Sequence, residues 1–229
     1  MVKLLLNKSL SLRIACDGES SSGKSTAAKL ISKKYKLFCM NSGLLFRYAS
    51  LLIIKHKPQK IELFLKKKFK NLNYKFISNL NLHSHEISNH VGILAKKKKV
   101  RLLIRSFQKK IIKKHKKICC EGRDQASTIL KQNPRYDIAF YFKCNLNTAS
   151  LRRWRDLKKK IPLKEVKKSL RTRTLLDKNR RHNPLIKVAD AVLIRTDILN
   201  KNAMIAKMSK EINKKLFVKY GRKYKPRKK

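Results

Sequence analysis

The first part of the chain alternates between short apolar runs and helical patterns. Residues 12–16 form an apolar run that predicts a buried strand, and residues 24–35 carry apolar side chains at helical spacing. A second apolar run at residues 37–40 precedes a helical pattern over residues 44–54, and we expect Ser42 to cap that helix. Strands and helices in alternation predict a mostly parallel sheet with helices on both faces.

The alternation stops between residues 58 and 108, where helical patterns follow one another without an obvious strand. We therefore expect a helical lobe inserted between two strands, ending in one long helix around residues 102–112. The side chains expected to face its core are Ile61, Leu63, Phe64, Leu65, Phe69, Leu72, Ile77 and Leu80.

The strand pattern returns in the second half of the chain. Further strands are predicted at residues 118–120, 137–142 and 191–195, which gives five strands, with helices at residues 146–158 and 201–218 and a helical stretch from residue 161. Trp154 is expected in a core or at a domain contact. The expected divisions are a core (1–54, 101–157 and 187–218), an inserted lobe (55–100), a lid (158–186) and a basic tail (219–229) that frays.

Composition adds an extreme charge. The 229 residues include 61 Lys and Arg against 13 Asp and Glu, a net charge of +48. Because the lysines are spread along the whole chain beside apolar helical faces, we interpret them as solvated surface rather than as a nucleic-acid site. Five cysteines without a C-x-x-C pair indicate reduced thiols in a cytoplasmic protein, and no apolar run reaches the length of a membrane span.

Residues 18–26 carry the strongest chemical signal. They read GESSSGKST, so Gly18, Gly23, Lys24 and Ser25 fill the template G-x-x-x-x-G-K-[ST] between a predicted strand and a predicted helix. Backbone N–H groups of such a loop, together with the helix N-terminus, bind phosphate oxygens. Lys24 is expected to reach the β- and γ-phosphates of ATP, and the Ser25 hydroxyl to hold Mg²⁺. The expected nucleotide-binding residues are Gly18, Glu19, Ser20, Ser21, Ser22, Gly23, Lys24, Ser25 and Thr26.

Two other groups of charged residues extend this picture. Glu121 follows the strand at residues 118–120, where enzymes with this loop place a second Mg²⁺-organising carboxylate; a turn-capping carboxylate is the alternative. Arg173 and Arg180 lie two helical turns apart with Asp177 between them. Such a face is suited to clamp an anion, although a surface ladder of salt bridges has the same pattern.

Taken in order, these motifs resemble the bacterial-type cytidylate kinases, over nearly the whole chain. Besides the loop, residues 41–47 (NSGLLFR) are similar to the family signature D-[ST]-G-x-x-Y-R. The insert ends in residues 86–89 (EISN) and the pair Val100-Arg101, and residues 121–124 read EGRD. The lid pattern R-x-x-x-D-x-x-R followed by Pro-Leu matches Arg173, Asp177, Arg180, Pro184 and Leu185. The resemblance implies a three-layer P-loop fold with a nucleoside-monophosphate-binding lobe and a lid.

The resemblance also implies roles for individual residues. The implied CMP site is Ser42, Arg47, Arg101, Arg123, Asp124, Arg173, Asp177 and Arg180. Arg101 and Asp124 are expected at the cytosine edge, which offers an amino donor beside acceptors. Three arginines, Arg47, Arg123 and Arg180, are expected on the monophosphate, and Asp177 on the ribose. Lys24, Arg123 and Arg180 are the expected catalytic cations, and Ser25 and Glu121 the metal ligands.

Some positions depart from the family pattern. Gly92 stands where the family usually has a base-contacting serine, and Leu176 where an arginine usually precedes the lid aspartate. Glu19 and Ser21 replace the usual proline and glycine of the loop, and Asn41 replaces an aspartate.

The implied reaction is ATP plus CMP or dCMP giving ADP plus CDP or dCDP, in pyrimidine nucleotide metabolism, by a monomer with Mg²⁺ and without nucleic-acid or membrane partners. One alternative is another small-molecule P-loop kinase, of the UMP or shikimate type. The other is a basic nucleic-acid-binding protein on a relic P-loop fold, for which the sequence offers no aromatic stacking platform.

Overall fold

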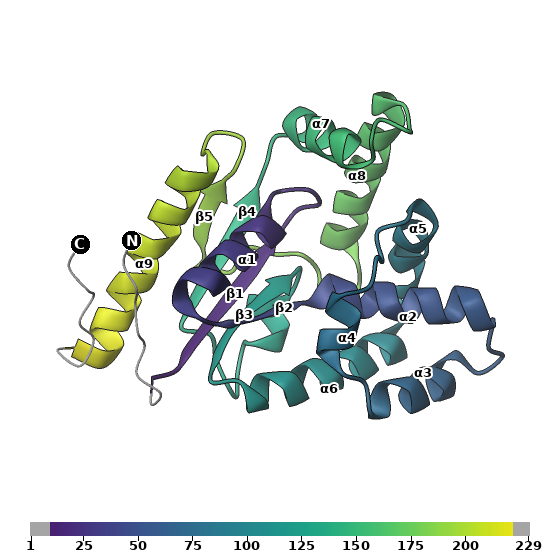
Figure 1. The fold of residues 1–229 in the computed structure, drawn as a ribbon, viewed down its shortest axis with the longest axis horizontal. Coiled ribbons are helices and arrows are strands. Elements are labelled where there is room, and N and C mark those ends of the chain that lie inside the picture. The colour runs from purple at the N-terminus through teal and green to yellow at the C-terminus, as the bar shows by residue number, and fades with distance from the viewer. Residues whose placement is uncertain (1–9, 222–229) are drawn as a thin grey trace.

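The computed structural model describes residues 10–221, and its centre is a sheet of five strands (Figure 1). The strands are β1 (Leu12–Gly18), β2 (Phe38–Asn41), β3 (Lys117–Gly122), β4 (Ile138–Lys143) and β5 (Val192–Arg195). Their order is β2-β3-β1-β4-β5, and every neighbouring pair is parallel. The predicted five-stranded α/β fold is confirmed. The predicted basic tail lies outside the described residues from 222 onward.

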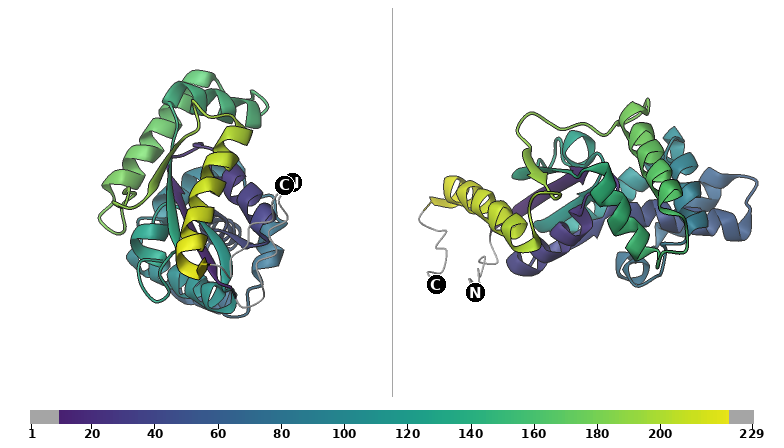
Figure 2. Two further views of the ribbon diagram at one scale, coloured as in Figure 1. Left: turned by 90° about the vertical axis from the view of Figure 1, so that its left-hand side faces the viewer. Right: turned by 90° about the horizontal axis from the view of Figure 1, so that it is seen from above.

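Alternation along the strands builds a three-layer molecule. On one face, Ile14 and Cys16 of β1 pack with helices α1 (Lys24–Tyr35) and α9 (Lys201–Tyr220). On the other face, Ala15 packs with α2 (Ser42–His56) and α6 (Lys98–Lys114). Because successive side chains of a strand point to opposite faces, one short apolar run serves both cores. Figure 2 shows the two helical layers on either side of the sheet.

The inserted segment between β2 and β3 is helical, as predicted. It adds α3 (Ile61–Lys70), α4 (Tyr74–Ser78) and α5 (His85–Leu94) to α2 and α6. Leu65 and Phe69 are buried one turn apart on α3, but Leu63 is 65% exposed, so its predicted place in the core is wrong. Residues two apart on a helix point to nearly opposite sides, which excludes Leu63 from the face that carries Leu65. Of the other expected core residues, Ile77 is buried and Ile61, Phe64, Leu72 and Leu80 are partly buried.

A further small core joins the predicted lid (158–186) to the helix before it. Helices α7 (Leu146–Asp156) and α8 (Leu163–Asn179) pack around Ala149, Val166 and Leu170, and Trp154 packs against this cluster. The predicted contact role of Trp154 is therefore confirmed. In Figure 1 the two helices stand above the carboxyl ends of the strands.

Two local predictions near the sheet edge are corrected. Helix α2 begins at Ser42 itself, and the residue at the N-cap position is Asn41, so Ser42 does not cap the helix. The Ser42 hydroxyl oxygen instead accepts hydrogen bonds from the side-chain amides of Gln108 and Gln125. Glu121 lies inside β3 rather than after it, because the strand continues to Gly122 and pairs Glu121 with Cys16 of β1.

Helix α1 ends in a conformation that lysine disfavours. Its C-cap residue Lys36 has φ 52° and ψ 49°, in the left-handed region, and is exposed. Side chains with a Cβ atom pay for this conformation, and glycine does not.

We therefore predict that Lys36→Gly raises the free energy of unfolding by about 1 kcal/mol. The matched control is Lys33→Gly, an exposed position inside the same helix, where glycine should lower stability by about 1 kcal/mol. Urea unfolding of both variants measures the effect. Destabilisation by both substitutions would contradict the prediction.

Candidate functional site

The loop between β1 and α1 is held close to the sheet. The Glu19 N–H donates to the Phe142 carbonyl at 3.2 Å, and a Cβ atom at Gly18 would lie 2.3 Å from that same oxygen. Gly23 occupies the N-cap of α1 with φ 77°, a left-handed conformation that favours glycine. Two of the motif glycines are thus required by geometry, and the loop delivers the chain to a helix N-terminus that attracts anions.

Lys24 is a buried cation at the bottom of this loop. It is only 5% exposed, and its Nζ donates to the Glu19 carbonyl at 3.0 Å and lies 3.7 Å from Glu121 Oε1. Burial, reinforced by the neighbouring Arg123, lowers the pKa of Lys24 to about 7, although Glu121 opposes the shift. An anion bound nearby would therefore stabilise the charged form of Lys24.

Glu121 supplies an oxygen that no described residue uses. Its Oε2 atom is buried and has no hydrogen-bond partner among residues 10–221. A buried polar atom without a partner is costly, and a carboxylate oxygen beside a serine hydroxyl is what a hard cation such as Mg²⁺ binds. Glu121 at the end of β3 and Ser25 at the start of α1 thus fit the cation that the motif implies.

Three charged side chains meet between the sheet and the lid. Asp177 of α8 accepts a hydrogen bond from Arg123 Nε at 2.7 Å, and Arg180 Nη1 lies 3.4 Å from its other oxygen. Although burial favours the neutral acid, Arg123 and then Arg173 hold the pKa of Asp177 below its ordinary value. Arg180 follows the end of α8 in extended backbone, so the predicted helical face does not reach it, although its Nη1 still contacts Asp177 Oδ1.

A second carboxylate lies deeper in the same region. Asp124 forms an ion pair with Arg101 of α6, and Arg180 Nη2 lies 3.9 Å from the same Asp124 oxygen. Both Arg101 and Asp124 are buried. The segment after β3, helix α6 and the segment after α8 therefore meet at one pair of charges.

Of the two remaining arginines of the expected site, Arg47 is buried and Arg173 is partly buried, and both lie among like charges. Arg47 Nη1 donates to the Leu82 carbonyl and to Ser88 Oγ, each at 2.9 Å. Burial, followed by repulsion from Arg153 and Arg123, lowers the pKa of Arg47 to about 10. Burial and then Arg123 likewise lower the pKa of Arg173 to about 10. The arginines of the lobe, the sheet and the lid therefore act on one another electrostatically.

Several residues of this region were not expected from the sequence. Arg153 of α7 belongs to the same field of positive charge. Asp17, whose pKa burial raises to about 7, accepts the N–H groups of Gln125 and Ala126 at 2.8 Å and so ties β1 to the short helix η1 (Gln125–Ile129). Neither residue was assigned a role from a sequence motif. Asp17 is identified by the hydrogen bonds that it accepts, and Arg153 by the position of α7.

Some expected residues point elsewhere. The Glu19 side chain accepts from Lys178 of α8 at 2.7 Å, so it faces the lid rather than the loop interior. Thr26 is exposed on the first turn of α1. Ser20 does face the cluster, because its Oγ accepts from Arg123 Nη2 at 3.1 Å.

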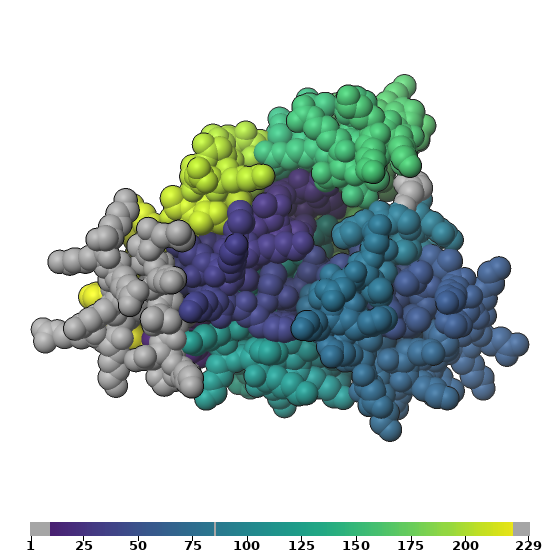
Figure 3. All heavy atoms as spheres, in the orientation of Figure 1, coloured from purple at the N-terminus to yellow at the C-terminus, as the bar shows by residue number. Residues whose placement is uncertain are grey.

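Two of the five positions that depart from the family pattern lie together. Gly92 and Leu176 line one cavity of about 40 Å³ between α5 and α8, with Arg173, Asp177 and Arg180. A Cβ atom at Gly92 would meet no atom within 4 Å. In Figure 3 the lid and the α5 region overhang the strand ends and the phosphate loop, and the molecule is hollowed between them.

Comparison with known proteins places this arrangement in a family. The model of the family described as "Cytidylate kinase" matches residues 14–214. Cytidylate kinases of Clostridium botulinum types B1 and A are each 31% identical over 220 residues, covering 90% of this chain and 99% of each relative. A bifunctional pantoate ligase/cytidylate kinase of Prochlorococcus marinus is 32% identical over 89% of this chain and 43% of that longer protein.

Solved structures agree on the fold. An uncharacterised protein from Eubacterium ventriosum has a TM-score of 0.52 at 14% identity, over 88% of this chain and 98% of its own. A protein from Thermus thermophilus has a TM-score of 0.52 at 13% identity, over 90% of this chain and 98% of its own. At such low identity these likenesses support the fold alone.

The lowered pKa of Lys24 gives a prediction. A polyphosphate anion bound beside Lys24 would raise the pKa of that lysine again. At about pH 8, binding of inorganic tripolyphosphate should therefore be accompanied by uptake of a proton. At about pH 5 the lysine is already charged, and this uptake should vanish. Calorimetry in buffers of different ionisation enthalpy measures the protons, and Lys24→Met serves as control. Equal uptake by the wild type and Lys24→Met would contradict the prediction.

Proposed function

The chain belongs to the cytidylate kinase family, and from that premise we propose that it transfers the γ-phosphoryl group of ATP to CMP or dCMP. The observation that carries the proposal is the meeting of two anion sites at one sheet edge. The phosphate loop with Lys24 lies on one side, and the arginines around Asp124 and Asp177 lie on the other.

The acceptor side is suited to a pyrimidine monophosphate. Asp124 and Arg101 present an acceptor and donors side by side, the pattern that the cytosine edge requires. Arg47, Arg123 and Arg180 supply guanidinium groups for the monophosphate, and Asp177 an acceptor for a ribose hydroxyl. In this proposal Ser42 and Arg173 complete the acceptor site.

The donor side is suited to ATP. The loop residues 18–26 wrap the triphosphate, with Lys24 beside the β- and γ-phosphates. Ser25 and Glu121 would hold Mg²⁺, which would supply charge compensation on the triphosphate, and the unpartnered Glu121 oxygen supports this assignment.

The reaction needs no covalent intermediate. An oxygen of the CMP phosphate forms a new bond to the γ-phosphorus, and the bond from that phosphorus to the β–γ bridging oxygen breaks, releasing ADP. Because the attacking oxygen is already an anion, no strong general base is required. Lys24, Arg123 and Arg180 stabilise the charge on the migrating group, which is the main contribution an enzyme makes to this chemistry.

The lid contributes water exclusion. Two contacts close it over the phosphates: Lys178 pairs with Glu19 of the loop, and Asp177 pairs with Arg123 at the strand end. Closure protects the γ-phosphoryl group from hydrolysis.

The setting of the enzyme is also part of the proposal. All five cysteines are free thiols, which supports a cytoplasmic location. Among residues 10–221 no helix combines the length and apolar character needed to cross a bilayer. We propose a monomer without a specific nucleic-acid partner, acting in pyrimidine nucleotide metabolism.

The test is steady-state kinetics with CMP, dCMP, UMP and AMP as acceptors, followed by ADP release. CMP should exceed UMP by about 10- to 100-fold in kcat/KM, the usual discrimination of one bidentate base contact. Lys24→Ala should lower kcat at least about 100-fold while the melting temperature stays close to that of the wild type. Equal rates with all acceptors, or near-normal turnover by Lys24→Ala, would reject the proposal.

Asp124 tests the acceptor site separately. Asp124→Ala removes the base-reading carboxylate, so the KM for CMP should rise about 10-fold or more, with less than about a twofold change in the KM for ATP. Asp124→Asn keeps the shape and is the matched control for loss of charge alone. An equal rise in both KM values would refute the role.

A further inference from the structure

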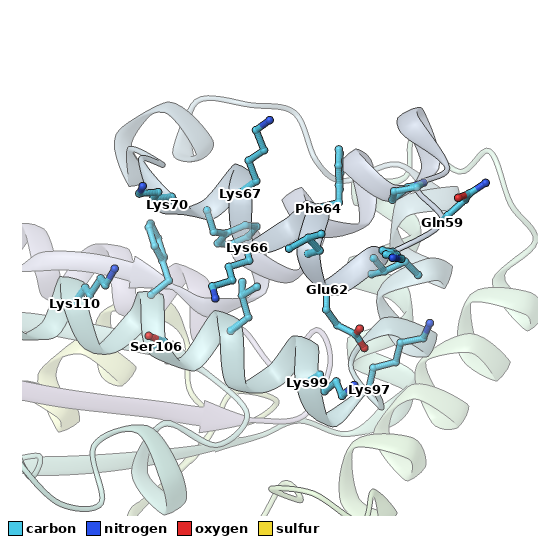
Figure 4. Close-up of a pocket in the computed structure, with 17 residues that line it drawn as sticks. Gln59, Glu62, Phe64, Lys66, Lys67, Lys70, Lys97, Lys99, Ser106 and Lys110 are labelled. Carbon is cyan, nitrogen blue, oxygen red and sulfur yellow. The ribbon is translucent and has the colours of Figure 1, made fainter.

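A large hollow on the described part of the molecule lies away from the phosphate loop. It is an open trough of about 1660 Å³ along α3 and α6 of the inserted lobe. Ligand pockets for small molecules are usually about 300–1000 Å³ and enclosed, so this trough is too large and too open for one. Figure 4 shows Glu62 and Lys66 extending from α3 toward α6, and Lys67 extending to the other side.

The floor of the trough is apolar. Leu63 and Phe69 of α3 and Leu103 and Phe107 of α6 line it, and the rings of Phe69 and Phe107 lie 5.5 Å apart. Leu63 is 65% exposed, which is the reason that its expected place in the core was wrong. On α6, Lys99, Leu103, Ser106 and Lys110 recur at helical spacing and line one side of the trough over about 16 Å. A helix face of this length matches a partner helix of three turns.

The rim of the trough is positively charged. Seven of its seventeen lining residues are lysines, and one, Glu62, is acidic. The seven lysines are Lys60, Lys66, Lys67, Lys70, Lys97, Lys99 and Lys110. All seven are exposed, and within residues 10–221 none of them takes part in an ion pair.

We propose that the trough docks an acidic amphipathic helix of a partner protein. Apolar side chains of that helix at positions i, i+3, i+4 and i+7 fill the floor beside Leu63 and Leu103. Its Asp and Glu side chains pair with the lysines on both rims, which have no carboxylates of their own apart from Glu62.

Charge and shape favour this occupant over others. A second copy of the chain would bring another +48 of charge against the same rim. A membrane is flat and does not fill a trough between two helices. Nucleic-acid sites favour arginine, whose planar group stacks and pairs bidentately, and none of the lining residues is an arginine.

The test uses the full chain and two labelled peptides of equal composition. One peptide has leucines at i, i+4, i+7 and i+11 among glutamates, and the other has the same residues scrambled. Fluorescence anisotropy at near-physiological salt should give an affinity at least about tenfold higher for the amphipathic peptide. Leu63→Glu should remove that advantage without changing phosphoryl transfer.

Matched variants map the binding to the trough. Leu102→Glu changes a leucine that is 53% exposed on α6 but does not line the trough, and it should leave binding within about twofold. Replacing Lys66, Lys99 and Lys110 by Gln should weaken binding at least about tenfold. The same change at Lys201, Lys207 and Lys210 of α9 should have less than half that effect.

Three results would overturn the proposal. The two peptides bind equally well, or Leu63→Glu and Leu102→Glu weaken binding equally, which would mean attraction to the overall charge. Alternatively, anionic phospholipid vesicles or oligouridine bind in a Leu63-dependent manner while the amphipathic peptide does not, which would make the trough a membrane or nucleic-acid site.

Discussion

The burial of several cations at one place is the constraint on which the rest of this site depends. Burial, and after it repulsion from Arg123, lowers the pKa of Lys24 to about 7. Arg47 and Arg173 show the same effect from the other side of the site. Lys24 and Arg123 follow the carboxyl ends of the parallel strands β1 and β3, and bound anions would stabilise the whole cluster.

Carboxylates neutralise only part of this positive charge, and each one pairs with particular arginines. Asp177 pairs with Arg123 and Arg180, and Asp124 with Arg101, so the lid, the sheet and the inserted lobe are joined by ion pairs at the place where substrates are proposed to meet. Glu121 keeps one oxygen without a partner. We propose that two phosphate-bearing substrates offset the remaining excess of positive charge when they bind side by side.

Much of this arrangement was predictable from the sequence, because the signals were local. The phosphate loop is a contiguous motif, and the apolar runs of the strands are short and clear, so fold class and loop followed directly. Arg153 and the capping role of Asp17 escaped prediction because they depend on which segments meet in space. Leu63 was misplaced because an apolar residue in a helix was taken to face the core, whereas its side of α3 remains exposed in the trough beside α6.

The central claim is that one cleft brings a triphosphate and a pyrimidine monophosphate together. A single molecule that joins cytidine and adenosine through a chain of five phosphates tests it most directly. Inhibition kinetics should find this compound competitive against both ATP and CMP, with an affinity higher than that of either substrate. Competition with one substrate only, or with neither, would contradict the account.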